Sequence, residues 1–130
     1  MTLNDPLANV LSFMNNQEKL GRKEMTTNNN SKLIREVLRI LQEEQYVGSY
    51  EETDDGKGKL LKINLLGKIN KCGVIKPRYK VQMKDYEKYE KRFLPAMGFG
   101  ILIVSTNKGL MTNAKAKEQN LGGTLISFAY

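Results

Sequence analysis

The chain has 130 residues, of which 40% are hydrophobic and 27% are charged, so it is long enough for one globular domain or two small halves. Its 21 Lys and Arg exceed its 14 Asp and Glu, for a formal net charge of +7, which favours an acidic partner such as nucleic acid. No apolar run approaches the roughly 20 residues of a membrane span. The single cysteine, Cys72, and an N-terminus unlike a signal peptide predict a reducing, cytoplasmic location.

The residue inventory argues against common catalytic chemistry. The sequence contains no histidine, so the commonest general base and metal ligand are both missing. Cys72 therefore has neither a histidine nor a second cysteine with which to form a nucleophilic pair or a zinc site. No phosphate-binding Gly-x-x-x-x-Gly-Lys motif is present. We expect a protein that is not an enzyme and that uses no cofactor or metal.

The first residues predict two helices. Asp5 can cap the first, with Pro6 at its first helical position, and Ser31 can cap the second. The polar segment 21–30 between them predicts a loop or a short edge strand. Apolar residues follow each cap at helical spacing: Leu7, Val10, Leu11 and Met14 in the first helix, and Leu33, Ile34, Val37, Leu38 and Leu41 in the second.

A β-hairpin is predicted next, with strands over 47–53 and 60–66 around the turn sequence "DDGKGK". In its second strand Leu61, Ile63 and Leu65 alternate with polar residues and can face the helices. The acidic residues Glu51, Glu52, Asp54 and Asp55 lie beside this turn. A metal-dependent hydrolase using these carboxylates is a distant alternative to a plain turn.

The second half is rich in predicted strands. They lie around Val74–Ile75, over 79–83, over 101–104 and over 124–130, with a short helix around 114–119. Another short helix ends before Pro95 and carries Tyr86, Tyr89 and Phe93 on one face. Such a stripe is usually core, and stacking on nucleic-acid bases is the sharper alternative.

These elements predict an α+β fold of two small, tightly packed α/β subdomains. Residues 1–66 form an α-α-β-β first domain, and residues 67–130 form a strand-rich second domain with a short helix. Each half alone has about 65 residues and would be marginally stable, so we expect the two to pack together.

Positive charge is concentrated in one segment. Residues 67–92 contain nine basic residues against three acidic ones, and so supply +6 of the net +7. Lys76 and Arg78 lie in this run, where neutralising phosphates would release counterions and give affinity without sequence preference. A lysine-rich face that serves only solubility is the alternative, although solubility requires no such clustering.

A polar pentapeptide follows the most hydrophobic strand. Ser105, Thr106, Asn107, Lys108 and Gly109 end the run "GILIV". Taken alone, these residues predict an ordinary hairpin turn. Their short donors and acceptors, one charge and a glycine also suit recognition of RNA shape, where hydroxyls, phosphates and base edges need partners at close range.

Several separated motifs resemble the small-subunit ribosomal protein S8 family, from Asp5 to Tyr130. They are "DPLANVL", "SKLI", "GILIVSTNKGLMT" and "NLGGTLISFAY", in the family's order. The stretch "GKINKCGVIKPRYKVQMKDYEKYEKRFLP" is similar to the form found in archaea and eukaryotes.

The resemblance implies two small α/β domains, direct binding to an irregular stem in the central domain of small-subunit ribosomal RNA, and an early role in assembly. It also implies neighbouring ribosomal proteins as partners, a place in the small ribosomal subunit, and neither a membrane nor a small-molecule substrate. The residues that it assigns to RNA are Ser105, Thr106, Asn107, Lys108 and Gly109, with Gly122 and Gly123 beside them and Asp5, Pro6, Ser31 and Lys32 in the first domain.

Two other classes of function stay open at this point. A non-ribosomal RNA-binding regulator, such as a repressor that binds messenger RNA, would use the same features. A protein-interaction module would instead direct the basic segment toward an acidic protein.

Overall fold

The structure is a computed structural model that describes residues 6–27, 31–54, 59–75, 78–96 and 99–130. Helices alternate with strands along the chain, and the strands form two antiparallel sheets. This arrangement confirms the predicted α+β class. The chain divides into two compact units, unit 1 (Met1–Asn70) and unit 2 (Lys71–Tyr130).

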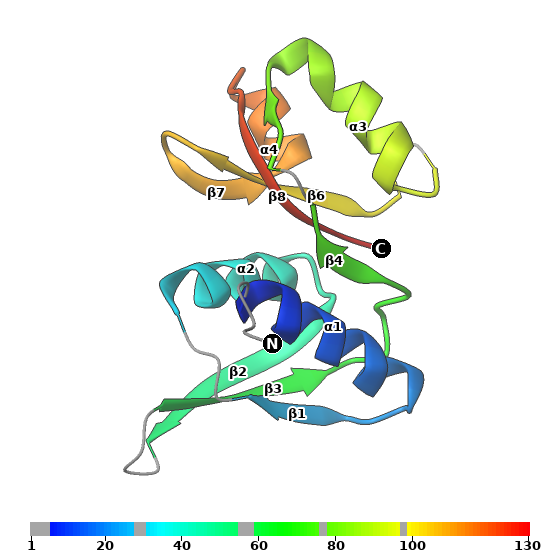
Figure 1. Cartoon of the computed structure of the whole chain (residues 1–130), viewed down its shortest axis with the longest axis vertical. Helices are drawn as coiled ribbons and strands as arrows, with labels where there is room; N and C mark the ends of the chain where they lie inside the picture. Colours follow the sequence, from blue (N-terminus) through cyan, green and yellow to red (C-terminus); the bar gives the residue numbers. More distant parts are fainter. Residues whose placement is uncertain (1–5, 28–30, 55–58, 76–77, 97–98) are drawn as a thin grey trace, which may run out of the picture. The chain divides into compact units, whose positions relative to one another are not determined.

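Unit 1 is a small sheet with helices on one face, as Figure 1 shows. Its described elements are α1 (Pro6–Lys19), β1 (Glu24–Thr27), α2 (Lys32–Glu43), β2 (Val47–Asp54) and β3 (Lys59–Leu65). The strands pair antiparallel in the order β1-β3-β2, so the segment that could have been a loop or an edge strand is an edge strand. The predicted hairpin is also confirmed, because Asp54 pairs with Lys59.

The core of unit 1 forms where the predicted apolar faces meet. Leu61, Ile63 and Leu65 are buried on β3 and alternate with exposed residues. The two helices bury their apolar stripes, which are Leu7, Val10, Leu11 and Met14 in α1 and Ile34, Val37, Leu38, Ile40 and Leu41 in α2.

The segment after β3 belongs to unit 1 for a physical reason. Ile69 is 6% exposed, and the backbone of Gly67 and Ile69 hydrogen-bonds the carboxyl group of Glu18 near the end of α1. These contacts tie residues 67–70 to the first helix, and the division of the chain falls after Asn70.

Unit 2 is built around a central strand. Its described strands are β4 (Cys72–Val74), β5 (Lys80–Val81), β6 (Ile101–Thr106), β7 (Gly109–Thr112) and β8 (Gly123–Ala129), and its helices are the 3₁₀ turn η1 (Met83–Asp85), α3 (Tyr86–Phe93) and α4 (Asn113–Glu118). The antiparallel order is β4-β8-β6-β7, and β5 also pairs with β8. The helix expected around 114–119 is α4, and the strand expected over 124–130 is β8. Each starts one residue earlier than expected.

The aromatic stripe of α3 is mainly core, as its spacing suggested. Tyr86 is fully buried, and its hydroxyl donates a hydrogen bond to the carbonyl of Leu121 at 2.8 Å. Tyr89 is 9% exposed and belongs to the same hydrophobic cluster, against which Phe93 packs. Stacking of RNA bases on Tyr86 or Tyr89 is wrong as an interpretation, because burial leaves no room for a base. Cys72 is also buried, as expected of a small apolar residue.

Candidate nucleic-acid interface

The pentapeptide at Ser105 to Gly109 forms the tip of the β6–β7 hairpin. Thr106 pairs with Gly109, which leaves Asn107 and Lys108 as a two-residue turn with both residues exposed. Gly109 has a φ of +106°, where a side chain would be strained, and an added Cβ would meet nothing within 4 Å. The glycine is therefore explained by its backbone conformation. The hairpin-turn interpretation is confirmed as local structure.

The hydroxyl group of Thr106 stiffens this turn from within. Its Oγ1 accepts a hydrogen bond from the backbone N–H of Lys108 at 3.1 Å and donates to the carbonyl of Gly109 at 2.9 Å. Because a hydroxyl has one proton and two lone pairs, a single acceptor position remains for a ligand. Ser105 is half-buried, and the exposed side chains of Asn107 and Lys108 form the outer surface of the tip.

The glycine pair lies beside the base of this hairpin. Thr124, the residue after Gly123, pairs with Ser105, and an added Cβ on Gly123 would overlap the carbonyl oxygen of Ser105. A Cβ on Gly122 would lie 2.6 Å from the carbonyl oxygen of Val81. Both glycines thus allow the start of β8 to lie close to two neighbouring backbones. From the sequence, Gly122 and Gly123 were expected to contact RNA. The structure gives a second reason for glycine at both positions, which is close packing of the backbone.

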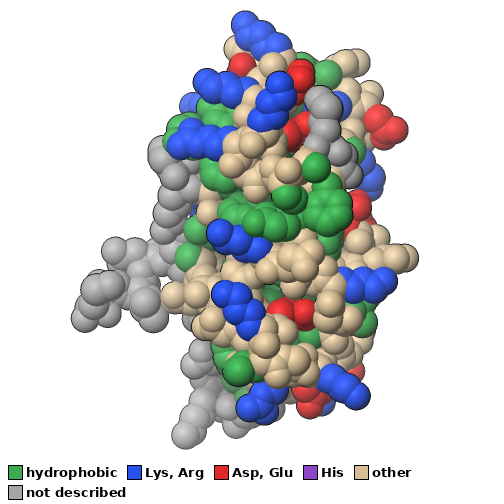
Figure 2. All heavy atoms as spheres, turned by 90° about the vertical axis from the view of Figure 1, so that its right-hand side faces the viewer, with side chains coloured by type: hydrophobic (Ala, Val, Ile, Leu, Met, Phe, Trp, Pro, Cys, Tyr) green, Lys and Arg blue, Asp and Glu red, His purple; other side chains and the backbone are tan. Residues whose placement is uncertain are grey.

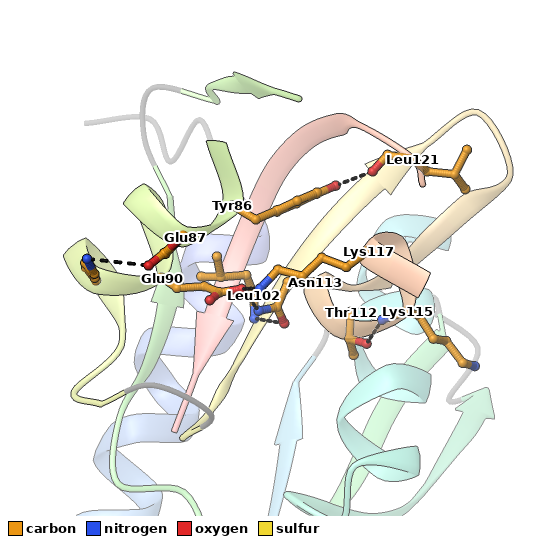
Figure 3. A network of polar contacts seen from close by, with 10 residues as sticks. Tyr86, Glu87, Glu90, Leu102, Thr112, Asn113, Lys115, Lys117 and Leu121 are labelled. Carbon is orange, nitrogen blue, oxygen red and sulfur yellow. Dashed lines mark hydrogen bonds and ion pairs between the residues drawn. The ribbon is translucent and has the colours of Figure 1, made fainter. Parts of the chain in front are cut away.

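A buried polar network supports the hairpin from its other end. Asn113 begins α4 directly after β7, and its Oδ1 accepts from the backbone N–H of Leu102 in β6 at 3.2 Å. Its Nδ2 donates to Oε1 of Glu90 in α3 at 2.6 Å, and the same carboxylate forms an ion pair with Lys117 of α4. Figure 3 shows how these side chains connect α3, α4 and β6.

Sequence reasoning missed this network, although part of its signal was present. Thr112 caps α4, with its hydroxyl accepting from the backbone N–H of Lys115 at 3.3 Å, and a threonine before "NAKAKE" is a recognisable helix start. The hydrogen bond between Asn113 and Glu90 joins residues 23 positions apart, so no local sequence pattern predicts it.

The basic segment is exposed wherever the structure describes its side chains. Those residues are Lys68, Lys71, Arg78, Lys80, Lys84, Lys88, Lys91 and Arg92, whereas Lys76 lies outside the described residues. Figure 2 looks onto the side of unit 2 that bears α3, and Lys and Arg side chains gather there beside exposed hydrophobic ones. Within the part of the chain that the structure describes, Lys91 forms an ion pair with Glu87 at 3.6 Å, and no other member of the set has a carboxylate partner.

The residues expected to contact RNA from the first domain have a different setting. Ser31 caps α2, and its Oγ accepts from the backbone N–H of Ile34 at 3.3 Å, which confirms the predicted cap. Lys32 and Pro6 are exposed at the starts of α2 and α1. Asp5 lies outside the described residues. These residues belong to unit 1, and the hairpin and glycine pair belong to unit 2.

Other chemistry finds no support in the described ranges. No group of three or more His, Cys, Asp or Glu residues there could hold a metal ion. Of the carboxylates near the β2–β3 turn, Glu52 forms an ion pair with Arg35 at 2.9 Å, and Asp55 lies outside the described residues. Among the described helices none is both long and apolar enough to cross a membrane.

A comparison with known protein families identifies the family of the chain. Residues 5–130 match the family described as Ribosomal protein S8, which is essentially the whole chain. Members of this family are structural, non-enzymatic components of the small ribosomal subunit, where they bind ribosomal RNA and lie beside other ribosomal proteins. A two-unit α+β fold with a basic second unit and a polar hairpin is thus the framework of an RNA-binding protein, and the chain belongs to the ribosomal protein S8 family.

Proposed function

We propose that the β6–β7 hairpin recognises the shape of an irregular stem in the central domain of small-subunit ribosomal RNA. The observation that carries the proposal is that the exposed amide of Asn107 lies in a turn already held by the hydroxyl of Thr106. A preorganised turn loses little conformational freedom on binding, so its contacts contribute more of their energy to affinity. Gly123 also lets the start of β8 lie close to the backbone of Ser105 at the base of the hairpin.

Two layers of contact act together in this proposal. The exposed cations of the basic segment, Arg78 among them, hold backbone phosphates and give affinity that falls with salt. The hairpin then distinguishes one RNA shape from another through hydroxyl, amide and backbone groups, which depend less on salt. Pro6, Ser31 and Lys32 add contacts from unit 1, although the hydroxyl of Ser31 already accepts one hydrogen bond as a cap.

The hairpin is tested by the double variant Ser105→Ala with Asn107→Ala. Purified protein is titrated with an irregular stem from the central domain and with a regular duplex of equal length, across a salt series. Wild type should prefer the irregular stem at high salt, and the double variant should lose about 1–3 kcal/mol of that preference while keeping its affinity for the duplex.

Lys108→Ala is the matched control within the same turn. It removes a charge but neither the Ser105 hydroxyl nor the Asn107 amide, so it should weaken both RNAs alike and flatten their salt dependence. Equal losses on both RNAs in the double variant would refute shape recognition by the hairpin.

Binding of this kind also suits a role in assembly of the small subunit in the cytoplasm. We expect the protein in a cell extract to sediment with small subunits and with their precursors. A free pool bound to messenger RNA, with little in ribosomal particles, would instead favour the regulator. Association with particles that survives complete RNA digestion would favour a contact made mainly with protein.

A further inference from the structure

A group of aromatic rings and one guanidinium meets on the surface of unit 2. The guanidinium of Arg92 lies 5.4 Å from the ring centroid of Tyr79 and 5.5 Å from that of Phe93. Arg92 is exposed, and both rings are half-buried. The planar guanidinium of arginine stacks readily on aromatic faces, which lysine does not reproduce.

Both rings are held in place by the core beneath them. Tyr79 lies 5.1 Å from the ring of buried Tyr89, and its carbonyl accepts from the backbone N–H of Leu125 at 2.9 Å. Phe93 stacks on Phe128 at 5.8 Å. A platform that is fixed before binding loses little side-chain entropy when a ligand arrives.

The charges around this group are not neutralised. Among the residues that the structure describes, Arg92 and Lys88 have no carboxylate partner, and Lys88 lies 5.5 Å from the ring centroid of Tyr89. Lys91, on the same helix, forms an ion pair with Glu87. Unneutralised positive charge beside half-buried aromatic rings, with an exposed guanidinium lying over them, is a combination that binds single-stranded nucleic acid: phosphates contact the cations, and a base stacks on the planar groups.

We propose that Tyr79, Phe93 and Arg92 form a stacking site for one unpaired base of the bound RNA, with Lys88 near the adjoining phosphate. The inference rests on the proposed RNA-binding function and adds a second contact to it. The site is distinct from the hairpin, because Figure 1 shows α3 and the β6–β7 turn on opposite sides of unit 2. An unpaired base fits this chemistry because bases inside a regular duplex are already stacked on one another.

The test uses the full-length protein and irregular stems in which 2-aminopurine replaces each unpaired nucleotide in turn. With wild type, the fluorescence at one position should change on binding because the base stacks on the platform. Arg92→Lys keeps the charge but removes the planar group, so it should abolish that change and weaken the irregular stem roughly tenfold. Its salt dependence should equal that of wild type.

Matched variants separate stacking from charge and from folding. Tyr79→Phe keeps the ring and should behave as wild type, whereas Tyr79→Leu should repeat the loss seen with Arg92→Lys. Lys115→Ala removes an exposed charge on α4, outside the basic segment, and should leave the fluorescence change intact. Amide spectra of each variant identify any that fails to fold, in which case the Arg92→Lys result decides.

Unaltered binding and fluorescence in Arg92→Lys would overturn the inference. If the hairpin double variant still loses its preference in that case, the proposed function stands and only the second contact fails. Unaltered RNA binding together with a loss of Arg92→Lys protein from assembled small subunits would also overturn it, in favour of a protein neighbour at this surface.

Discussion

The two units are similar in size but differ in how their charges are arranged. Unit 1 has ten Lys and Arg against ten Asp and Glu, whereas unit 2 has eleven against four, so the whole excess of +7 lies in unit 2. In unit 1 several cations are neutralised locally, as in Arg35–Glu52, Arg39–Glu43 and Lys62–Glu24. We therefore expect unit 2 to make the main electrostatic contact with RNA, because only a net excess of charge attracts a polyanion at a distance.

The two units also differ in how closely their glycines are packed, and replacing a closely packed glycine gives the largest expected loss of stability. Gly123→Ala in unit 2 should cost about 3 kcal/mol of stability, because the new Cβ collides with the backbone of Ser105 and must push β8 away from β6. Gly21→Ala in unit 1 has open space and only an unfavourable φ of +72°, so it should cost about 1 kcal/mol. Hydrogen exchange resolved by residue measures both, and equal costs would contradict the packing role of Gly123.

A buried network in unit 2 and an exposed hydrogen bond in unit 1 provide the next contrast. Asn113→Ala should cost about 2 kcal/mol, because it leaves the N–H of Leu102 and the carboxylate of Glu90 with one partner fewer in a buried site. Asn64→Ala removes an exposed bond of 2.8 Å to Ser49 and should cost less than about 0.5 kcal/mol. Urea denaturation followed by circular dichroism measures the free energy of unfolding of both variants. A small effect of Asn113→Ala would show that the buried network does not stabilise the hairpin.

Charge removal tests the electrostatic comparison directly. Arg78→Ala with Lys80→Ala in unit 2 should flatten the slope of log affinity against log salt by about 1 for each phosphate left without its cation, on irregular and regular RNA alike. Arg39→Ala with Lys62→Ala removes the same charge from paired positions in unit 1 and should change the slope much less. Similar slopes for the two double variants would show that RNA binding draws equally on both units.

The smallest expected effect concerns Glu18 in unit 1. Burial raises the pKa of its carboxyl, although hydrogen bonds from the backbone of Gly67 and Ile69 act in the opposite direction. A raised pKa in the folded state means that this group contributes stability below its unfolded pKa, and that the contribution is lost as pH rises through the folded pKa. Relative to wild type, Glu18→Gln should therefore gain stability as the pH rises from the unfolded pKa of a glutamate through the higher folded pKa of Glu18.

Glu44→Gln, at an exposed position just after α2, serves as the control for this titration. Thermal unfolding of both variants and wild type across the pH range makes the comparison. A difference between Glu18→Gln and wild type that does not vary with pH would show that burial of the Glu18 carboxyl has no net consequence for stability.

Much of the fold could be predicted because its signals are local. Ser31 predicted the start of α2 because its side chain can cap the backbone N–H of Ile34. The alternation of apolar and polar residues around Ile63 predicted β3. The hairpin turn before β7 was predicted but the bounds of that strand were not, because "GLMT" is only four residues long and its pairing with β6 depends on a partner rather than on its own pattern. Short strands carry little periodicity, so their existence is decided by the sheet that they join.

The candidate site divides in the same way. The pentapeptide from Ser105 to Gly109 and the charge of the basic segment were visible as composition. The sequence could not show which of these side chains already form hydrogen bonds within the protein. The hydroxyl of Thr106 donates to the carbonyl of Gly109 in its own turn, whereas the side chain of Asn107 is exposed. The grouping of Tyr79 with Arg92 also lay beyond sequence reasoning, because the two residues are 13 positions apart and meet only when α3 and Tyr79 pack against the same core cluster.

The sequence by itself determined the α+β class, the family, the excess of positive charge and the absence of histidine chemistry, because these follow from composition, short periodic patterns and ordered motifs. Only the tertiary structure decided why Gly122 and Gly123 must be glycines, which carboxylate Asn113 binds, and which ring carries Arg92. Each of these depends on backbones or side chains from distant segments approaching within a few ångströms. Such distances are set by the packing of the whole unit rather than by any local run of residues.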